Sequence, residues 1–323
     1  MRNSLLLGGL SAAVLGLVLV RSLERRTPPP DPQRQALLQA GRAVVASAVA
    51  DLHLQPAQDA PLADQALLGH TLTLVSPQPA QGPFVQVETV ERYRGYVLAA
   101  ALVPLPPGAP PYGESGPVVV VRSRLAQLYA EPDVTRRPPL LAAPLGVRLA
   151  LLAEIDRRWL VVRLPDGRRG HIQRGDVELG EPPRLSAACV LDHALRYEGT
   201  PYLWGGRSTL GIDCSGLTAN AYRACGSPIP RDAHLQHAFA GLRPVPVAEA
   251  QPGDLLFFGD GAPTSGTPKV THVGLYLGQG EFIHATTQDR PTVHQSRLDE
   301  PTWQRLLVGV RRHPGMDPTP ARP

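Results

Sequence analysis

The chain has 323 residues, of which 43% are hydrophobic and 19% charged, so it is too long for one hydrophobic core and too apolar for a mostly disordered protein. Its 36 prolines and 31 glycines, against only 5% aromatic residues, disfavour an all-helical fold. The net charge of +4 comes with arginines scattered along the chain, whereas nucleic-acid binding needs a concentrated basic stripe. We therefore expect several domains and no nucleic-acid partner.

The first segment of the chain is apolar. Leu5 to Val20 carries no charged residue, which is typical of the hydrophobic part of a signal sequence or of a membrane anchor. Arginines follow at Arg21 and Arg25 without a clear cleavage site, so release and anchoring both stay open. We predict that residues 1–20 direct the protein to the cell envelope or out of the cell. If they are instead an upstream extension from a misplaced start, the protein would be cytoplasmic.

Two regions of short apolar segments come next, at residues 43–103 and 118–181. In both, runs rich in Val and Leu alternate with turn signals, a pattern that favours small all-β barrels. Each follows a proline-rich stretch, at 21–42 and 104–117, which we predict to be a linker. The two regions resemble a tandem of bacterial SH3-like barrels. One larger β-sandwich is the alternative.

The pattern changes to mixed α and β between residues 184 and 313, before a flexible tail at 314–323. Ser186 is expected to cap a first helix, and a second helix is expected to begin near Asp213. Cys214 therefore lies at a helix N-terminus. Unpaired backbone N–H groups and the positive end of the helix dipole favour a thiolate there, so we expect a lowered pKa for this cysteine.

Two histidines lie on a predicted hairpin, whose strands run from Val270 to Leu277 and from Glu281 to Ala285. With a three-residue turn, Gly274 lies opposite His284, and His272 is the diagonal neighbour on the same face. A two-residue turn would shift the pairing by one and put the imidazoles on opposite faces. The first register brings the rings together, with His272 as a base that His284 orients.

A zinc site formed by Cys214 and both histidines is a second interpretation of the same residues. No fourth ligand or supporting carboxylate is evident, so we expect no metal and no cofactor. Three cysteines are too few for a disulfide framework, and Cys189 and Cys225 are predicted as core residues. A disulfide between those two stays open.

This constellation closely resembles the NlpC-type family of bacterial cell-wall cysteine peptidases. The matching strings are TPYLWGG from Thr200, DCSG from Asp213, IPR from Ile229, QPGDLLFF from Gln251, HVGLYLG from His272 and FIHA from Phe282. The resemblance implies an α+β papain-like cysteine peptidase domain preceded by the two barrels. It also implies that Cys214 is the nucleophile, His272 the base and His284 the orienting residue, with Tyr202 helping the oxyanion site.

The order of domains resembles the dipeptidyl-peptidase branch of that family, on the strings ADQALLG from Ala63 and YRGYV from Tyr93 in the first barrel. In that branch the first barrel closes one end of the cleft, leaving room only for a free N-terminal L-Ala. The bond cut would join γ-D-Glu to meso-diaminopimelate or lysine, and the protein is expected to be a monomer. The candidate substrate-binding residues are Asp213, Ser215, Tyr93, Trp204 and Arg231.

The chain departs from the family pattern at three places near the expected cleft. It has GHI at residues 170–172 where an aromatic is usual, an acidic Asp232 where a small hydroxyl is usual, and a long loop over 259–269. Three other functions share the same motifs: an endopeptidase acting on intact peptidoglycan, a catalytically silent wall-binding protein, and an acyltransferase.

Overall fold

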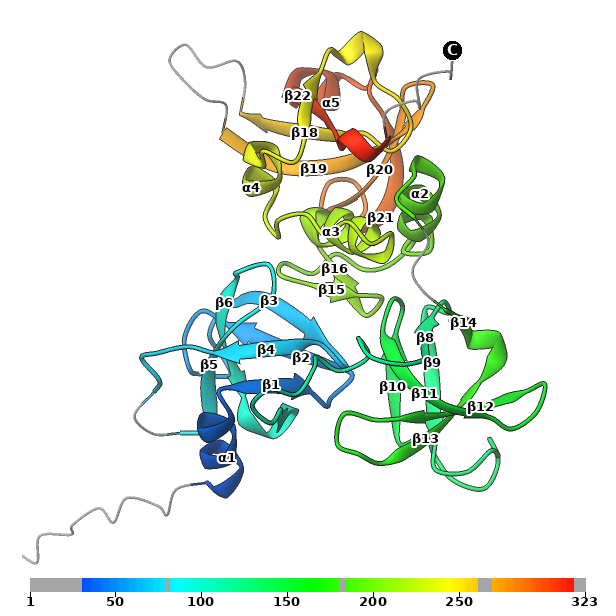
Figure 1. Ribbon diagram of the computed structural model, residues 1–323. Helices are drawn as coiled ribbons and strands as arrows, with labels where there is room; N and C mark the ends of the chain where they lie inside the picture. Colours follow the sequence, from blue (N-terminus) through cyan, green and yellow to red (C-terminus); the bar gives the residue numbers. More distant parts are fainter. Residues whose placement is uncertain (1–30, 80–81, 181–183, 261–268, 317–323) are drawn as a thin grey trace, which may run out of the picture. The chain divides into compact units, whose positions relative to one another are not determined.

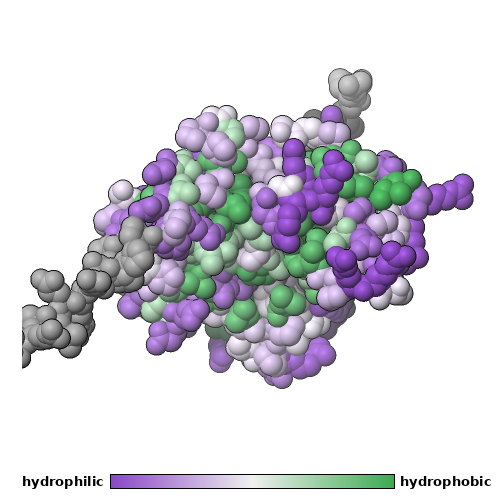
Figure 2. Space-filling view, turned by 90° about the horizontal axis from the view of Figure 1, so that it is seen from below, coloured by the Kyte–Doolittle hydropathy of each residue, from purple (hydrophilic) through white to green (hydrophobic). Residues whose placement is uncertain are grey.

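The computed structural model describes residues 31–79, 82–180, 184–260 and 269–316 (Figure 1). The predicted signal or anchor segment and most of the predicted tail lie outside these residues. Among the residues that the structure describes, no helix has the length and apolar composition needed to cross a membrane. On the face shown in Figure 2, hydrophobic side chains lie among hydrophilic ones instead of forming one continuous area.

Helix α1 (Pro32–Ala40) corrects the linker expected over 21–42. The side chain of Asp31 caps its N-terminus by accepting a hydrogen bond from the backbone N–H of Gln33. Pro32 is tolerated as the first helical residue because an N–H at that position would have no partner within the helix. Leu37 is fully buried against the first sheet's core. The prolines mark the start of this helix, and the apolar anchor residue keeps it folded.

Two seven-stranded antiparallel sheets follow. The first contains β1 (Arg42–Val45), β2 (Val49–His53), β3 (Leu62–Leu67), β4 (Thr71–Leu74), β5 (Phe84–Glu88), β6 (Arg94–Leu98) and β7 (Leu102–Pro104). The second contains β8 (Val118–Val121), β9 (Leu125–Tyr129), β10 (Leu141–Pro144), β11 (Arg148–Glu154), β12 (Trp159–Arg163), β13 (Arg169–Gln173) and β14 (Val177–Leu179). We refer to them as the first and second β lobes.

The two β lobes repeat one topology. In each, the strands lie in the order third, second, sixth, fifth, fourth, first, seventh. A single 3-10 turn separates the sixth strand from the seventh in both lobes, η1 (Ala99–Ala101) and η2 (Arg174–Asp176). The first lobe buries one set of Val and Leu side chains, and the buried set of the second lobe also includes Leu67 and Leu68 from the first. The described residues thus form two seven-stranded sheets of the same strand order.

The C-terminal region contains a six-stranded sheet with helices packed on it. Its strands lie in the order β17 (Arg243–Val245), β22 (Leu307–Arg312), β18 (Leu255–Asp260), β19 (Lys269–Gly278), β20 (Glu281–Thr286) and β21 (Thr292–Arg297). The helices are α2 (Ala187–Leu195), α3 (Cys214–Ala224), α4 (Ala233–Ala238) and α5 (Pro301–Leu306), and a small ribbon joins β15 (Arg207–Ser208) to β16 (Gly211–Ile212).

Alternation along β18 places apolar side chains on both faces of this sheet. Leu255 and Phe257 pack into the core shared with α2 and α3, whereas Leu256 and Phe258 pack with Trp303 of α5 on the other face. A strand that is buried on both faces has consecutive apolar residues in its sequence, as in the string LLFF here. The result is the α+β architecture that the sequence predicts for this region.

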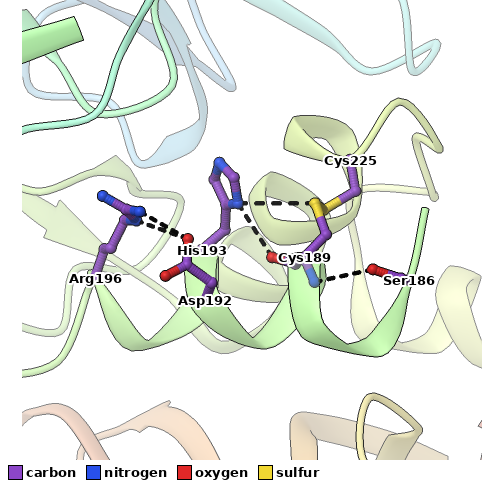
Figure 3. Close-up of a disulfide and its surroundings, with 6 residues drawn as sticks. All are labelled: Ser186, Cys189, Asp192, His193, Arg196 and Cys225. Carbon is purple, nitrogen blue, oxygen red and sulfur yellow. Dashed lines mark hydrogen bonds and ion pairs between the residues drawn. A yellow bond between two sulfur atoms is a disulfide. The ribbon is translucent and has the colours of Figure 1, made fainter. Parts of the chain in front are cut away.

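A disulfide between Cys189 and Cys225 joins the start of α2 to the end of α3 (Figure 3). Ser186 caps α2 beside it by accepting from the N–H of Cys189, and His193 lies one turn further along. The bond resolves the pairing that the sequence left open. It leaves Cys214 as the free cysteine of the chain.

Reducing this disulfide is expected to lower the free energy of unfolding by about 3–4 kcal/mol. The two cysteines are 36 residues apart, and closing a loop of that length restricts the unfolded chain by about this amount. Urea denaturation with and without a thiol reductant measures the difference. The double variant Cys189→Ser/Cys225→Ser is the control: it should match the reduced protein and respond no further to reductant. Equal midpoints for all samples would contradict the prediction.

Candidate active site

Cys214 is the first residue of α3 and is 7% exposed. Asp213 caps this helix, as its Oδ1 accepts a hydrogen bond from the N–H of Gly216 at 2.7 Å. Gly216 is required because a Cβ there would collide with the carbonyl oxygen of Gly206. The string DCSG thus combines a cap, a thiol and a close backbone approach in one turn. The helix start and the place of Cys214 agree with the sequence prediction.

The hairpin that carries the histidines has a turn of two residues, Gln279 and Gly280, both with positive φ. The three-residue turn expected from the sequence is therefore wrong. A β-bulge between Tyr276 and Gly278 adds one residue to β19, however, and this shifts the register back by one. Beyond the bulge, Tyr276 pairs with Phe282 as the three-residue turn would have required.

The two imidazoles therefore converge. His272 Nε2 lies 2.8 Å from His284 Nδ1, and a Cβ on Gly274 would lie 3.2 Å from the Cβ of His284. His284 is fully buried, and its Nε2 lies 3.1 Å from the Oγ of Ser296 on β21. His294, which also lies on β21, pairs directly opposite His284, and the centroids of the two rings are 5.1 Å apart. A line of polar groups thus runs from His272 through His284 to Ser296.

Aromatic side chains enclose this histidine pair. The ring of Trp303 stacks on His272, with centroids 5.4 Å apart, and meets His284 edge to face at 4.6 Å. Burial lowers the pKa of His272 to about 4 and that of His284 to about 2. Both imidazoles are therefore neutral near pH 7, which is the state that a general base requires.

The pKa of Cys214 differs from the sequence expectation. Burial raises it to about 12, and the neighbouring Asp213 carboxylate acts in the same direction. The backbone N–H groups of Val273 and Ser215 lower it, as a helix N-terminus should, but their effect is smaller. The resting site thus holds a neutral thiol and a neutral imidazole.

Iodoacetamide is accordingly expected to modify Cys214 very slowly at pH 7, because only the thiolate reacts. With the pKa raised, the thiolate fraction should grow about tenfold per pH unit up to at least pH 9. Intact-mass spectrometry over a pH series measures the rate, and since the other two cysteines are paired, one label reports this thiol alone. Free cysteine is the reference. A rate plateau between pH 5 and 8 would instead indicate a preformed thiolate.

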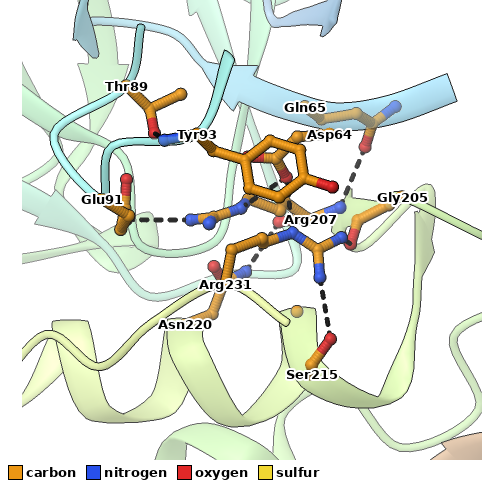
Figure 4. A network of polar contacts seen from close by, with 12 residues as sticks. Asp64, Gln65, Thr89, Glu91, Tyr93, Gly205, Arg207, Ser215, Asn220 and Arg231 are labelled. Carbon is orange, nitrogen blue, oxygen red and sulfur yellow. Dashed lines mark hydrogen bonds and ion pairs between the residues drawn. The ribbon is translucent and has the colours of Figure 1, made fainter. Parts of the chain in front are cut away.

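Asp213 is also one end of a buried chain of ion pairs, drawn in part in Figure 4. The members of this ion-pair chain alternate in sign and are, in order, Asp213, Arg231, Asp64, Arg207, Glu91 and Arg223. Arg231 binds both oxygens of Asp213, at 2.9 and 2.7 Å, and its Nε donates to Asp64 Oδ1 at 2.6 Å. Burial lowers the pKa of Arg231, but the two carboxylates raise it well above its usual value.

The rest of the ion-pair chain comes from the first β lobe, the small ribbon and α3. Arg207 Nε donates to Asp64 Oδ1 at 2.8 Å, and its Nη1 lies 3.1 Å from Glu91. Glu91 also pairs with Arg223 on α3, and the backbone N–H of Arg207 donates to Gln65 Oε1 at 3.0 Å. The first β lobe therefore contributes buried charges to the structure around Cys214.

The other predicted site residues fall in different environments. Ser215 is buried and accepts a hydrogen bond from Arg231 at 2.9 Å. Tyr93 is half-buried, and burial raises the pKa of its phenol. Tyr202 is half-buried, and burial raises its pKa, with the charge of Cys214 acting in the same direction. Trp204 is 69% exposed, so it is a surface residue and not a core aromatic.

Several residues of the site escaped sequence reasoning. The structure adds Ser296, His294, Trp303, Asp64, Glu91 and Arg207. One local signal existed: His294 and Ser296 alternate on a strand that directly follows the hairpin, so they share a face. The acidic residues of the first β lobe carry no such signal.

Known proteins resemble both the sequence and the structure. The sequence pattern that describes the NlpC/P60 family matches residues 199–312 of this chain. The chain is 31% identical over 264 residues to a gamma-D-glutamyl-L-lysine dipeptidyl-peptidase of Bacillus cereus, covering 78% of this chain and 75% of that protein. It is 28% identical to dipeptidyl-peptidase 6 of Lysinibacillus sphaericus, covering 80% and 92%. The crystal structure of an NlpC/P60 family protein from Bacillus cereus superposes with a TM-score of 0.72 at 26% identity, covering 84% and 99%.

Proposed function

The chain belongs to the NlpC/P60 family of cysteine peptidases, and from that premise we propose that it hydrolyses murein peptides with a free N-terminal L-Ala. The bond cut is the one between γ-D-Glu and the diamino acid. The observation that carries this proposal is the histidine pair at 2.8 Å together with the hydrogen bond from the backbone N–H of Val273, the neighbour of His272, to the Cys214 thiol at the start of α3. The printed names of the relatives at 31% and 28% identity support the choice of bond.

We assign the hydrogens of the histidine pair from the role of His272. For this residue to take a proton through Nδ1, its Nε2 must donate to His284 Nδ1. His284 then carries its hydrogen on Nε2, from which it donates to Ser296 Oγ. Each group in the line thus has one donor and one acceptor, and this fixes the orientation of the catalytic imidazole.

The reaction proceeds through a thioester. Cys214 Sγ attacks the γ-carbonyl carbon of D-Glu while its proton passes to His272. The resulting oxyanion lies near the N-terminus of α3, with the Tyr202 hydroxyl as a further donor. The imidazolium then protonates the leaving amine of the diamino acid. Water attacks the thioester and gives its proton to the same imidazole, which releases L-Ala-γ-D-Glu and restores the thiol.

The two β lobes are, in this proposal, SH3-like barrels over residues 43–103 and 118–181, with the catalytic domain over 184–313. Their shared strand order supports descent of one unit from the other. The first restricts the cleft to substrates whose chain starts at L-Ala, and the ion-pair chain holds it against the catalytic domain. The protein acts as a monomer in the cell envelope or outside the cell, released or anchored through residues 5–20.

The test compares L-Ala-γ-D-Glu-L-Lys, its diaminopimelate analogue and the N-acetylated form of each. Liquid chromatography with mass detection follows release of the dipeptide. We expect cleavage of one or both free peptides and loss of cleavage on acetylation. Equal cleavage of the acetylated peptides would show an endopeptidase. Absence of cleavage in all four would contradict the proposed activity.

A further inference from the structure

A group of metal-binding side chains lies where the start of α2 meets the end of α3. Among the residues that the structure describes, Cys189, His193 and Cys225 bring their donor atoms within 4.8 Å of one another. Cys189 and His193 are four residues apart on α2 and so share one face of that helix, whereas Cys225 ends α3 (Figure 3). Cys214 is at the opposite end of α3, and the catalytic mechanism uses none of these three residues.

The position of the His193 ring fits a tetrahedral zinc ion. With Zn–S bonds of about 2.3 Å and Zn–N bonds of about 2.0 Å, a sulfur and a nitrogen on one zinc are about 3.6 Å apart. His193 Nδ1 lies 4.0 Å from Cys189 Sγ, so this pair is already close to that spacing. Two sulfurs on one zinc are about 3.8 Å apart. The cysteine Cα atoms are 6.1 Å apart, which lets the sulfurs separate to that distance after reduction by rotation about the Cα–Cβ bonds.

The charges of such a site balance. Two thiolates and a neutral imidazole neutralise Zn²⁺, which matters because Cys225 is only 2% exposed and an unpaired charge there would be costly. Cys189 is the third residue of α2, where the helix dipole favours a thiolate. The junction of the two helices is therefore neutral both as a disulfide and as a zinc complex.

A metal ion can reach these side chains from solvent. Cys189 and His193 are half-buried, and His193 lines a cavity of about 640 Å³ together with Ala224 and Gly226, the two neighbours of Cys225. Water from this cavity can supply a fourth ligand. The cavity wall carries as many glutamates as arginines, so it has no excess positive charge that would repel a cation; these residues are Arg42, Arg148, Arg223, Glu91, Glu114 and Glu178.

We propose that the reduced protein binds one Zn²⁺ through Cys189, Cys225 and His193, so that a metal replaces the disulfide as the link between α2 and α3. A dithiol reductant gives up two electrons and two protons and becomes a disulfide, and each cysteine sulfur of the protein gains one proton. Zn²⁺ then displaces both thiol protons. The Nδ1 hydrogen of His193, which the carbonyl oxygen of Cys189 accepts at 3.1 Å, gives way to a hydrogen on Nε2, and this frees the Nδ1 lone pair for the metal.

Metal binding is measured on the untagged Cys214→Ala chain, which removes the catalytic thiol as a competing ligand. After reduction and transfer to oxygen-free buffer, native mass spectrometry should show one Zn²⁺ per chain. Co²⁺, used as a probe, should give a thiolate-to-metal charge-transfer absorption that Zn²⁺ removes. The oxidised sample should show neither signal. Zn²⁺ should also raise the urea midpoint of the reduced protein and leave that of the oxidised protein unchanged.

His193→Gln, in the same chain, tests the third ligand while keeping both cysteines. It should weaken Zn²⁺ binding by more than about tenfold, because even residues that only orient a metal ligand contribute about 10- to 100-fold. His234→Gln removes an exposed histidine from α4 and is the matched control, with unchanged affinity.

Three results would each overturn the inference: no Zn²⁺ on the reduced chain, equal binding by the oxidised chain, or equal affinity in His193→Gln and His234→Gln. Since none of these measurements uses turnover, they stand or fall separately from the proposed peptidase activity.

Discussion

Replacing Cys214 with alanine is expected to reduce hydrolysis of L-Ala-γ-D-Glu-L-Lys by more than about 10³-fold, since no other free thiol is present to form the thioester. The fold should survive, because alanine fits the buried site and the Asp213 cap is retained. Mass detection of the released dipeptide gives the rate, and near-ultraviolet circular dichroism reports the fold.

His272→Ala should lose nearly as much activity, and the double variant little more, because the two residues act as one unit. The variant Cys189→Ser/Cys225→Ser is the matched control for loss of sulfur: it should keep most of its turnover at 25 °C, because its residues lie at the far ends of the helices from the thiol. Unchanged turnover in Cys214→Ala would refute the nucleophile assignment.

Arg231→Met is expected to lower the free energy of unfolding by about 3–5 kcal/mol, the usual cost of leaving buried carboxylates without their partner. Two of them, Asp64 and Asp213, lose a guanidinium that is itself 2% exposed. The first β lobe should also separate more easily from the catalytic domain, because Asp64 spans that contact. Urea denaturation measures the change in stability.

The matched control is Arg297→Met, which removes a guanidinium that is 50% exposed and bound to Asp299 and Glu281. Exposed pairs contribute less than about 1 kcal/mol, so this variant should remain close to the unsubstituted protein. Two variants of equal stability would show that the buried ion-pair chain contributes no more than a surface pair.

Local sequence patterns were sufficient to predict the start of α3 and the convergence of the two histidines on the hairpin. Asp213 is a good cap three residues before Gly216, and alternation of apolar residues in the hairpin places His272 and His284 on one face. The length of the hairpin turn was harder to predict, because a β-bulge does not change the pattern of apolar and polar residues in the strand beside it. Two errors, a turn shorter by one residue and an unseen bulge between Tyr276 and Gly278, cancel in the register.

Properties that depend on distant parts of the chain could not be predicted in this way. The pairing of Asp64 with Arg207 spans 143 residues, and a single acid in an apolar strand gives no sign of its partner. The raised pKa of Cys214 has the same origin, since burial by the assembled domain outweighs the local helix dipole. The helix over residues 32–40 was missed because its prolines were interpreted as linker composition, whereas the buried Leu37 decides the outcome.

The bulge in β19 also limits which length changes this domain can accumulate. Deleting or inserting one residue between Gly274 and Phe282 would turn His284 away from His272, whereas a change of two residues would return it to the same side. Evolution at this hairpin tip should therefore proceed in even steps, or in odd steps only where the bulge is gained or lost at the same time.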